Sequence, residues 1–155
     1  MITLAPPELE FISRMRLEIE PSISVGETLE GNRMFSGIAG GYVDGPFFSG
    51  EIIRGGTAWI TELTPDFCEI DVHYIVKTKE SALIEVQAKH HRFGQGQIVQ
   101  QVFRQENVSR DLYSMHATVR LSSAHEKSKW LNYRVFLANA RRDAVRVTSD
   151  IYTLV

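Results

Sequence analysis

Cysteine and long apolar runs are both scarce in this sequence, and each absence argues against a class of protein. Cys68 is the only cysteine among the 155 residues, so the chain can form no internal disulfide and is a poor candidate for a structural zinc site. A chain without disulfides suits a reducing compartment, and we expect a cytoplasmic location. The N-terminus lacks a basic stretch followed by an apolar one, and no apolar run reaches the roughly 18 residues of a membrane span. We therefore expect neither export nor membrane insertion.

Motifs for nucleotide, metal and serine chemistry are also missing. The glycine-rich residues 36–41 lack the lysine of a phosphate-binding loop, and residues 93–96 are too short for a dinucleotide fingerprint. There is no G-x-S-x-G nucleophile elbow and no His-x-His pair. His90 and His91 are adjacent and point to opposite faces of a predicted strand, so they cannot bind one metal together. We therefore expect no cofactor and no metal.

The charge balance gives no sign of a nucleic-acid partner. The 17 Lys and Arg residues nearly balance the 19 Asp and Glu residues, for a formal net charge of −2. Such a chain has no bulk attraction to a phosphate backbone. The basic residues of the C-terminal third are spread over predicted strands and turns, which is typical of a solvated surface.

Glycine, in contrast, is concentrated in one stretch. Nine of the eleven glycines lie between Gly26 and Gly56. Glycines this frequent argue against a helix, since each would cost about 1 kcal/mol relative to alanine. Glycines inside strands commonly mark bulges and sharp bends, so we predict such features at Gly40-Gly41 and Gly55-Gly56. Backbone permissiveness explains these residues without any ligand.

Alternating polar and apolar residues indicate strands over most of the remaining chain. In residues 11–19, Met15, Leu17 and Ile19 alternate with charged residues, as in a strand with one buried face. We find no convincing helix longer than two turns, no internal repeat and no domain boundary, so residues 1–155 are expected to form a single domain. Strands at this regular spacing indicate a barrel or a sandwich. Further long strands are predicted at residues 57–63, 68–78, 82–89, 98–103, 114–121, 133–140 and 145–155.

Three signatures follow one another along the chain. They are a glycine-rich series from Gly31-Asn32-Arg33 to Gly55-Gly56-Thr57-Ala58-Trp59, then Asp71-Val72-His73-Tyr74, then Trp130-Leu131-Asn132. From about residue 15 to the C-terminus, the chain thereby resembles the domain-of-unknown-function 3237 family, also called uncharacterised protein family 0311. The resemblance implies an all-β fold, a compact antiparallel β-barrel of about eight to ten strands with little helix. It implies little about activity, because that family has no settled function.

The departures from the family pattern bear on chemistry. Ala58 stands where the family usually has Asp before the tryptophan, and His73 stands where it has Arg before the tyrosine. Glu80-Ser81 replaces the Asp-Gly of the family's hairpin and is less suited to positive φ. A mechanism that uses that Asp or Arg therefore does not carry over to this chain.

The predicted hairpin around residues 80–81 brings together candidate catalytic residues. With a two-residue turn, His73 faces Ala88 and Asp71 faces His90, so these side chains share one face of the sheet. Asp71, His73 and His90 then form an acid–base cluster in the barrel interior, where a carboxylate orients an imidazole that titrates near neutral pH. The alternative is an exposed strand end with ordinary polar residues, and a one-residue slip of the register would exchange the faces of one strand relative to the other.

Four further residues are candidate substrate contacts. Arg33 offers a guanidinium fork for a carboxylate or enolate, and the alternative is that it ties a strand to a loop carboxylate. Trp59 and Trp130 offer flat apolar walls for a ligand, and Tyr113 lies in a predicted loop from which it could reach a barrel mouth. The alternative for these aromatic residues is packing in the core.

Three functions remain open at this point. The first is a cofactor-free isomerase, cyclase or lyase that acts on an aromatic or polyketide-like substrate in the barrel interior. The second is a carrier that binds a small hydrophobic molecule without turnover. The third is a filled barrel with a structural or oligomer-forming role, and association into a homo-oligomer is left open in every case. The fold alone does not choose between them, whereas the size and polarity of an interior cavity would.

Overall fold

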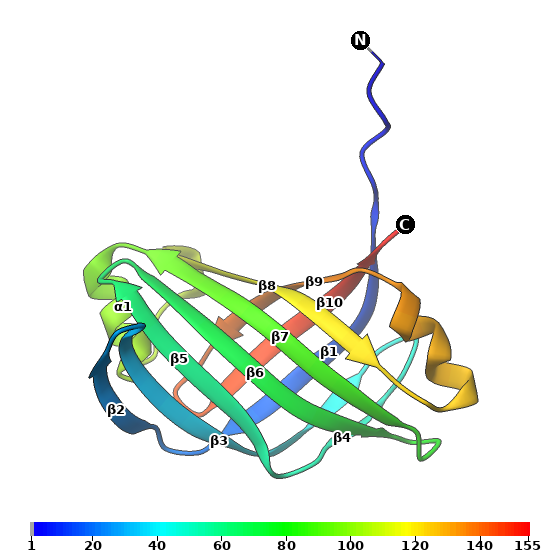
Figure 1. Cartoon of the computed structure of the whole chain (residues 1–155), viewed down its shortest axis with the longest axis horizontal. Coiled ribbons are helices and arrows are strands. Elements are labelled where there is room, and N and C mark those ends of the chain that lie inside the picture. Colours follow the sequence, from blue (N-terminus) through cyan, green and yellow to red (C-terminus); the bar gives the residue numbers. More distant parts are fainter. Residues whose placement is uncertain (1) are drawn as a thin grey trace.

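The computed structural model describes residues 2–155 and consists mainly of antiparallel strands (Figure 1). The ten strands are β1 (Leu9–Ile19), β2 (Ile23–Thr28), β3 (Gly31–Asp44), β4 (Gly50–Ile52), β5 (Gly56–Thr64), β6 (Phe67–Thr78), β7 (Leu83–Gly94), β8 (Tyr113–Ser122), β9 (Phe136–Arg142) and β10 (Arg146–Leu154). The helical segments are one α-helix, α1 (Gly96–Phe103), and two 3-10 segments, η1 (Arg110–Leu112) and η2 (Glu126–Tyr133).

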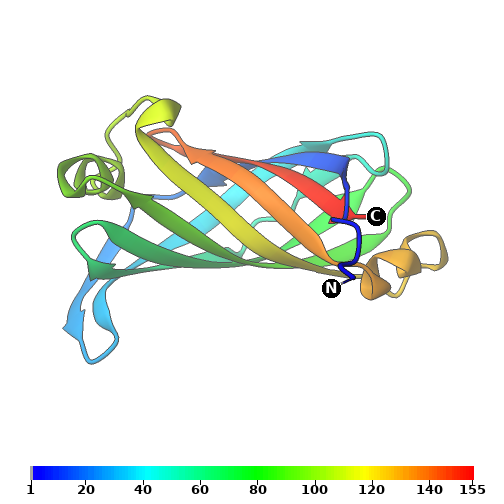
Figure 2. The same ribbon diagram turned by 90° about the horizontal axis from the view of Figure 1, so that it is seen from above.

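The sheet closes on itself because β1 pairs with both β10 and β3. From β1 the neighbours follow in the order β10, β9, β8, β7, β6, β5 and β3, so eight strands form the closed barrel. The strand β2 pairs with the first residues of β3, and together they project from one end of the barrel (Figure 2). At the other end, β4 takes the place of β5 between β3 and β6. The predicted all-β fold, a compact antiparallel barrel with little helix, is confirmed.

Alternation along the strands fills the barrel with apolar side chains. In β6, the buried residues Cys68, Ile70, Val72, Tyr74 and Val76 are separated by residues that point outwards. Each fully buried Val, Leu or Ile side chain stabilises the fold by roughly 1.5–3 kcal/mol relative to its exposed state. Because every barrel strand contributes one face to the same interior, the core and the barrel interior are the same space.

Paired glycines let β3 bend where it crosses β1 and closes the barrel. Gly40 and Gly41 have φ angles of 148° and 144°, and Ala39 is left without a partner on β1. A Cβ atom on Gly41 would overlap the carbonyl oxygen of Arg16. Gly55, with φ of 115°, forms the bend between β4 and β5. The bulge and the bend predicted from the glycine pairs are both confirmed, since few other residues adopt these backbone angles without strain.

The turn between β6 and β7 contains three residues, so the register predicted for this hairpin is wrong by one position. Thr78 pairs with Ala82, and Ser81 adopts a left-handed conformation with φ of 64°. Three-residue hairpin loops end in a residue of this kind, whereas the common two-residue turn needs positive φ at both central residues. A single residue with positive φ therefore favours the three-residue loop. The longer loop shifts the pairing by one residue, so each side chain of β7 lies on the opposite face, relative to β6, from the one predicted.

Residues 98–103, predicted as a strand, are helical and belong to α1. Val99 and Val102 are fully buried, and Ile98 and Phe103 pack against the core beside them. These four apolar residues lie at positions 98, 99, 102 and 103, a spacing that fits the 3.6-residue period of a helix. A stretch of six residues is too short to separate that period from strand alternation. The helix lies at the end of the barrel where β7 finishes and β8 begins (Figure 1).

The segment η2 lies at the opposite end of the barrel. Leu131 is buried there, and the Trp130 ring packs against Phe47 with centroids 5.5 Å apart. The Asn132 side chain fixes this segment, because its amide donates to the Ser123 carbonyl and its oxygen accepts from the Ser123 N–H, both at 2.8 Å. Separately, no helix within residues 2–155 has the length and apolar character needed to cross a membrane.

Candidate functional site

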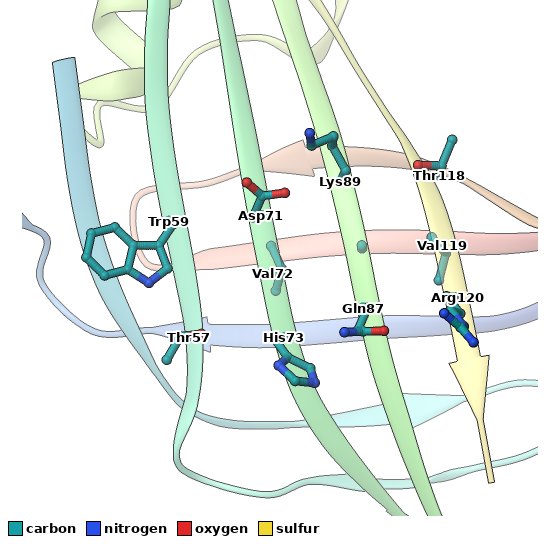
Figure 3. Close-up of a pocket in the computed structure, with 11 residues that line it drawn as sticks. Thr57, Trp59, Asp71, Val72, His73, Gln87, Lys89, Thr118, Val119 and Arg120 are labelled. Carbon is teal, nitrogen blue, oxygen red and sulfur yellow. The ribbon is translucent and has the colours of Figure 1, made fainter. Parts of the chain in front are cut away.

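A groove of about 510 Å³ lies on the outer surface of β5, β6, β7 and β8 (Figure 3). Its outward-facing side chains include an aromatic ring, charged groups of both signs and several amide or hydroxyl groups. They are Thr57, Trp59, Asp71, His73, Gln87, Lys89, Thr118 and Arg120. Figure 3 shows these side chains spread over four neighbouring strands of the barrel wall.

The observed register separates the predicted catalytic cluster. Asp71 and His73 pair with Lys89 and Gln87, and all four side chains point to the outer face. His90 points into the barrel and is buried. The prediction that Asp71, His73 and His90 share one face is therefore wrong, because the register slips by one residue at the turn.

His73 forms an ordinary surface contact on the outer face. Its Nε2 atom lies 2.6 Å from Oε2 of Glu85, and both side chains are about half exposed. Exposed pairs of this kind contribute about 0–1 kcal/mol to stability. The environment of Asp71 and His73 thus matches the alternative of an exposed polar strand face.

A second hollow is enclosed inside the barrel and has a volume of about 30 Å³. A water molecule needs roughly 10–15 Å³ on this measure, so the cavity has room for one or two. The barrel is thus nearly filled, with most of its lining apolar, but the cavity wall also carries a group of polar side chains. They are Ser36, Tyr74, His90, Arg92, Arg142 and Ser149. Ala58, where the family pattern has Asp, lies in the same wall.

His90 is held in the cavity wall as a neutral imidazole. It is 4% exposed, and within residues 2–155 neither of its ring nitrogens has a hydrogen-bond partner. Burial lowers the pKa of this imidazole to about 4, and the neighbouring Arg92 charge acts in the same direction. A polar contact with the Ile70 backbone, which lacks the geometry of a hydrogen bond, raises the pKa. At neutral pH the ring therefore offers one N–H donor and one lone pair to a ligand.

Two buried arginines at the α1 end of the barrel line the same cavity as His90. Arg92 and Arg142 are 3% and 6% exposed, and the Nε atom of each lacks a partner within the described residues. Burial lowers the pKa of both guanidinium groups, to about 10 for Arg142. The polar part of the cavity is consequently cationic.

Tyr113, a predicted substrate contact, lies beside these arginines. Its hydroxyl accepts a hydrogen bond from the Arg142 backbone N–H at 2.9 Å and donates one to the Arg142 carbonyl at 3.3 Å. These two bonds fix the end of β9 against the start of β8. Tyr113 thus braces the wall that carries Arg142, and its contact with a ligand stays a prediction.

The other predicted substrate contacts lie away from the interior cavity. The Arg33 guanidinium sits 4.7 Å from the centre of the Trp59 ring and 3.2 Å from Glu30, so it ties β3 to the adjacent turn. The Trp59 ring also packs against Phe35, with centroids 5.0 Å apart. Trp130 lies at the η2 end. Ligand binding by Arg33, Trp59 and Trp130 stays a prediction.

The buried Cys68 thiol is not a candidate nucleophile. Burial raises the pKa of Cys68 to about 11, so it stays protonated at neutral pH and is a poor nucleophile. Among residues 2–155 there is also no group of three or more His, Cys, Asp or Glu side chains that could hold a metal ion. The ionisable groups that face the cavity are therefore confined to His90, the two arginines and Tyr74.

Arg92 and Arg142 are the site residues that the sequence prediction missed. Each lies just beyond the end of a predicted strand, since those strands were expected to stop at residues 89 and 140. Extending the alternation of β7 from Val86 through His90 would have put Arg92 on the same inward face. An arginine at an inward position of a barrel strand is the signal that was available.

The comparisons with known proteins agree with the barrel. The family described as "Protein of unknown function (DUF3237)" matches residues 7–154. A UPF0311 protein of Bradyrhizobium diazoefficiens is 28% identical over 145 residues, which span 94% of this chain and 95% of that protein. A solved beta-barrel-like protein of Acinetobacter baumannii has a TM-score of 0.86 and 27% identity, with 100% of both chains covered.

A more distant relative is described as an enzyme. The hydroalkoxylation enzyme phnH of Penicillium herquei is 32% identical over 81 residues, which span 52% of this chain and 54% of that protein. This match is limited to about half of each chain, whereas the DUF3237 match spans nearly the whole sequence. The chain therefore belongs to the DUF3237 family of proteins of unknown function.

Proposed function

We propose that the chain binds a small, largely apolar organic molecule at the α1 end of the barrel interior and acts on it as a cofactor-free isomerase, cyclase or lyase. The observation that carries this proposal is His90. It is a buried, neutral imidazole whose two ring nitrogens are unpaired within the described residues and which lines a mostly apolar cavity. Leaving such a polar group without a partner costs about 1–3 kcal/mol, so its retention supports a role in contact with a ligand.

A neutral imidazole in this position suits proton transfer. One ring nitrogen can accept a proton from a substrate while the other donates a hydrogen bond, so the ring shuttles a proton between two atoms of one molecule. The surrounding apolar wall leaves room for at most one or two water molecules and strengthens each electrostatic contact. Isomerisation, ring closure and elimination need such a proton shift and no redox partner.

Binding requires space that the resting barrel lacks, and α1 is the element best suited to provide it. The helix has two fully buried residues and no side-chain hydrogen bond at its N-terminal cap. The segment is further held by Gln100 Nε2 to the Pro65 carbonyl at 3.4 Å and by Gln105 Nε2 to Ser22 Oγ at 2.6 Å. The helix is thus held by few polar contacts, and its opening exposes mainly the two buried valines, at a cost of roughly 3–6 kcal/mol that ligand binding offsets.

The relative from Penicillium herquei supports an enzyme over a purely structural protein. That enzyme is named for hydroalkoxylation, which joins an alcohol oxygen to an alkene carbon. Such an addition moves one proton without net oxidation or reduction, and this is the kind of step that a neutral His90 can assist. The similarity over 81 aligned residues supports related chemistry for this chain.

A filled barrel without a ligand is the competing function, and the small interior cavity favours it. A carrier is the third function, because most of the cavity lining is apolar. The three functions differ in measurable ways. An enzyme binds and converts a compound, a carrier binds it unchanged, and a filled barrel does neither.

The test compares wild type with His90→Gln and with the matched control His73→Gln on the outer groove. Each protein is screened by calorimetry and by mass spectrometry of reaction mixtures against aromatic and polyketide-like compounds that include alkenyl phenols. We expect His90→Gln to retain binding and to lose at least about a hundredfold in turnover, the usual contribution of a general acid or base. His73→Gln should match wild type. Equal turnover in wild type and His90→Gln would refute the role of His90.

A further inference from the structure

We propose that the α1 end of the barrel interior is an anion site, in which the Arg92 and Arg142 guanidinium groups hold the carboxylate of a small, otherwise apolar organic acid. The site deepens the proposed function by naming the ionised group of the ligand, and it rests on that function for its location. It does not depend on turnover, so the two can be tested separately.

The first support is that neither guanidinium group has an ion-pair partner among the described residues. Both side chains are more than nine-tenths buried, and no ion pair within residues 2–155 includes Arg92 or Arg142. Burying an ion costs several kcal/mol after relaxation, and folded proteins normally offset this with an opposite charge. Two buried guanidinium groups without ion-pair partners at one end of a barrel point to an anion from outside the chain.

The neighbouring groups supply only weak acceptors. Nη2 of Arg92 lies 4.0 Å from the sulfur of Met115, and Nη2 of Arg142 donates to the Ala144 carbonyl at 3.3 Å. The Cys68 thiol near Arg92 stays protonated, as described above. The Asp143 charge raises the pKa of Arg142, against the larger effects of burial and Arg92, but Asp143 forms no ion pair with Arg142 among the described residues. None of these groups neutralises either charge.

The two guanidinium groups also act on each other. After burial, the Arg92 charge is the next largest cause of the lowered pKa of Arg142. Like charges that interact in a poorly solvated interior destabilise the unliganded barrel. Both side chains line the same cavity of about 30 Å³, so one anion placed there attracts both guanidinium groups. The net electrostatic energy of the three charges is then favourable, whereas that of the two arginines alone is not.

A carboxylate matches this setting in shape, size and polarity. A guanidinium group presents a planar fork of N–H donors that pairs with the two oxygens of a carboxylate. The cavity volume of about 30 Å³ suits a compact group. Beyond the arginines the walls are formed by apolar side chains such as Ile60, Ile70 and Val147. The ligand is therefore an organic acid whose body is apolar.

The test measures binding of charged and neutral compounds of equal shape. Benzoate and hexanoate are compared with benzamide and hexanamide by calorimetry and thermal unfolding, in a buffer of low chloride and without phosphate. We expect wild type to bind the carboxylates at least tenfold more tightly than the amides. Arg92→Met and Arg142→Met should each remove this preference. Arg141→Met is the matched control, because Arg141 precedes Arg142 on β9 but is exposed, and it should behave as wild type.

Stability of the unliganded variants separates anion binding from a structural role. Methionine keeps an apolar stem and removes an unpaired charge, so both variants should unfold at the wild-type temperature or higher. Lowered unfolding temperatures with an unchanged carboxylate preference would overturn the proposal, as would equal binding of benzoate and benzamide by wild type.

A third variant keeps both arginines and tests the same site from the opposite wall. Ala58→Asp places a carboxylate in the same cavity, so it should neutralise the arginines and abolish the preference for benzoate. This variant decides the question if the methionine variants fail to fold, and full retention of the benzoate preference would then refute the site. His90→Gln should still bind benzoate, so loss of turnover and loss of anion binding remain distinguishable.

Discussion

His90 and Arg92 lie two residues apart on the inward face of β7, and burial affects them in different ways. It leaves the imidazole neutral at physiological pH, whereas the high intrinsic pKa of arginine keeps the guanidinium charged. A base and a fixed cation are thus adjacent in a space with little water. This arrangement can accept a proton from an acidic group and stabilise the anion that remains.

The depressed pKa of His90 makes the stability of the protein depend on pH. An unfolded histidine has a pKa of about 6.5, and that of His90 in the folded protein is about 4, so the unfolded state binds the proton first as pH falls. Stability should therefore be lost from about pH 6.5 down to about pH 4, by about 3 kcal/mol in total. Urea unfolding of wild type and His90→Gln at half-unit pH steps measures this loss.

The histidines outside the barrel interior serve as an internal control for this experiment. They are present in both wild type and His90→Gln, so the difference between the two curves isolates His90. The variant should lack the extra loss of stability below pH 6.5. Two curves that stay parallel from pH 7 to pH 4 would show that His90 is not held in a poorly solvated site.

At the scale of elements, the hairpin of β6 and β7 decides which side chains meet. Alternation alone predicts both strands, because each has one buried face. It does not predict their register, because that depends on the φ angle of Ser81 and hence on a turn of three residues. His90 is interior as expected, whereas Asp71 and His73 are outside. The helix α1 was missed because it presents only a few apolar residues over little more than two turns.

The left-handed conformation of Ser81 offers a direct test of this turn. Replacing Ser81 by Gly relieves the strain of a positive φ and should raise the free energy of unfolding by up to about 1 kcal/mol. The matched control Glu80→Gly adds flexibility at a residue without positive φ, so it should lower the free energy of unfolding. Chemical denaturation of both variants gives the values. A loss of stability in Ser81→Gly as large as that in Glu80→Gly would contradict the three-residue turn.

At the scale of the whole molecule, the outer surface of the barrel carries charges of both signs, whereas the interior carries positive charge. Ion pairs such as Arg14 with Asp150 at 2.6 Å and Arg16 with Asp44 at 3.0 Å lie on the outside. Within the described residues, the charged side chains that line the interior cavity are arginines. The overall net charge of −2 conceals this division, and the sequence could not reveal it without the register of each strand.

Closure of the barrel depends on the contact between β1 and β3 at Gly41. A Cβ at residue 41 would overlap the Arg16 carbonyl, and its φ of 144° disfavours any side chain, so Gly41→Ala should cost at least about 3 kcal/mol of unfolding free energy. Gly55→Ala is the matched control, because φ is also positive there but a Cβ would meet no atom within 4 Å. It should cost only about 1–2 kcal/mol from backbone strain. Guanidinium unfolding followed by circular dichroism measures both. Equal losses in the two variants would mean that the close approach of β1 to β3 does not control closure, whereas a larger loss in Gly41→Ala with a single cooperative transition would show that the whole barrel depends on it.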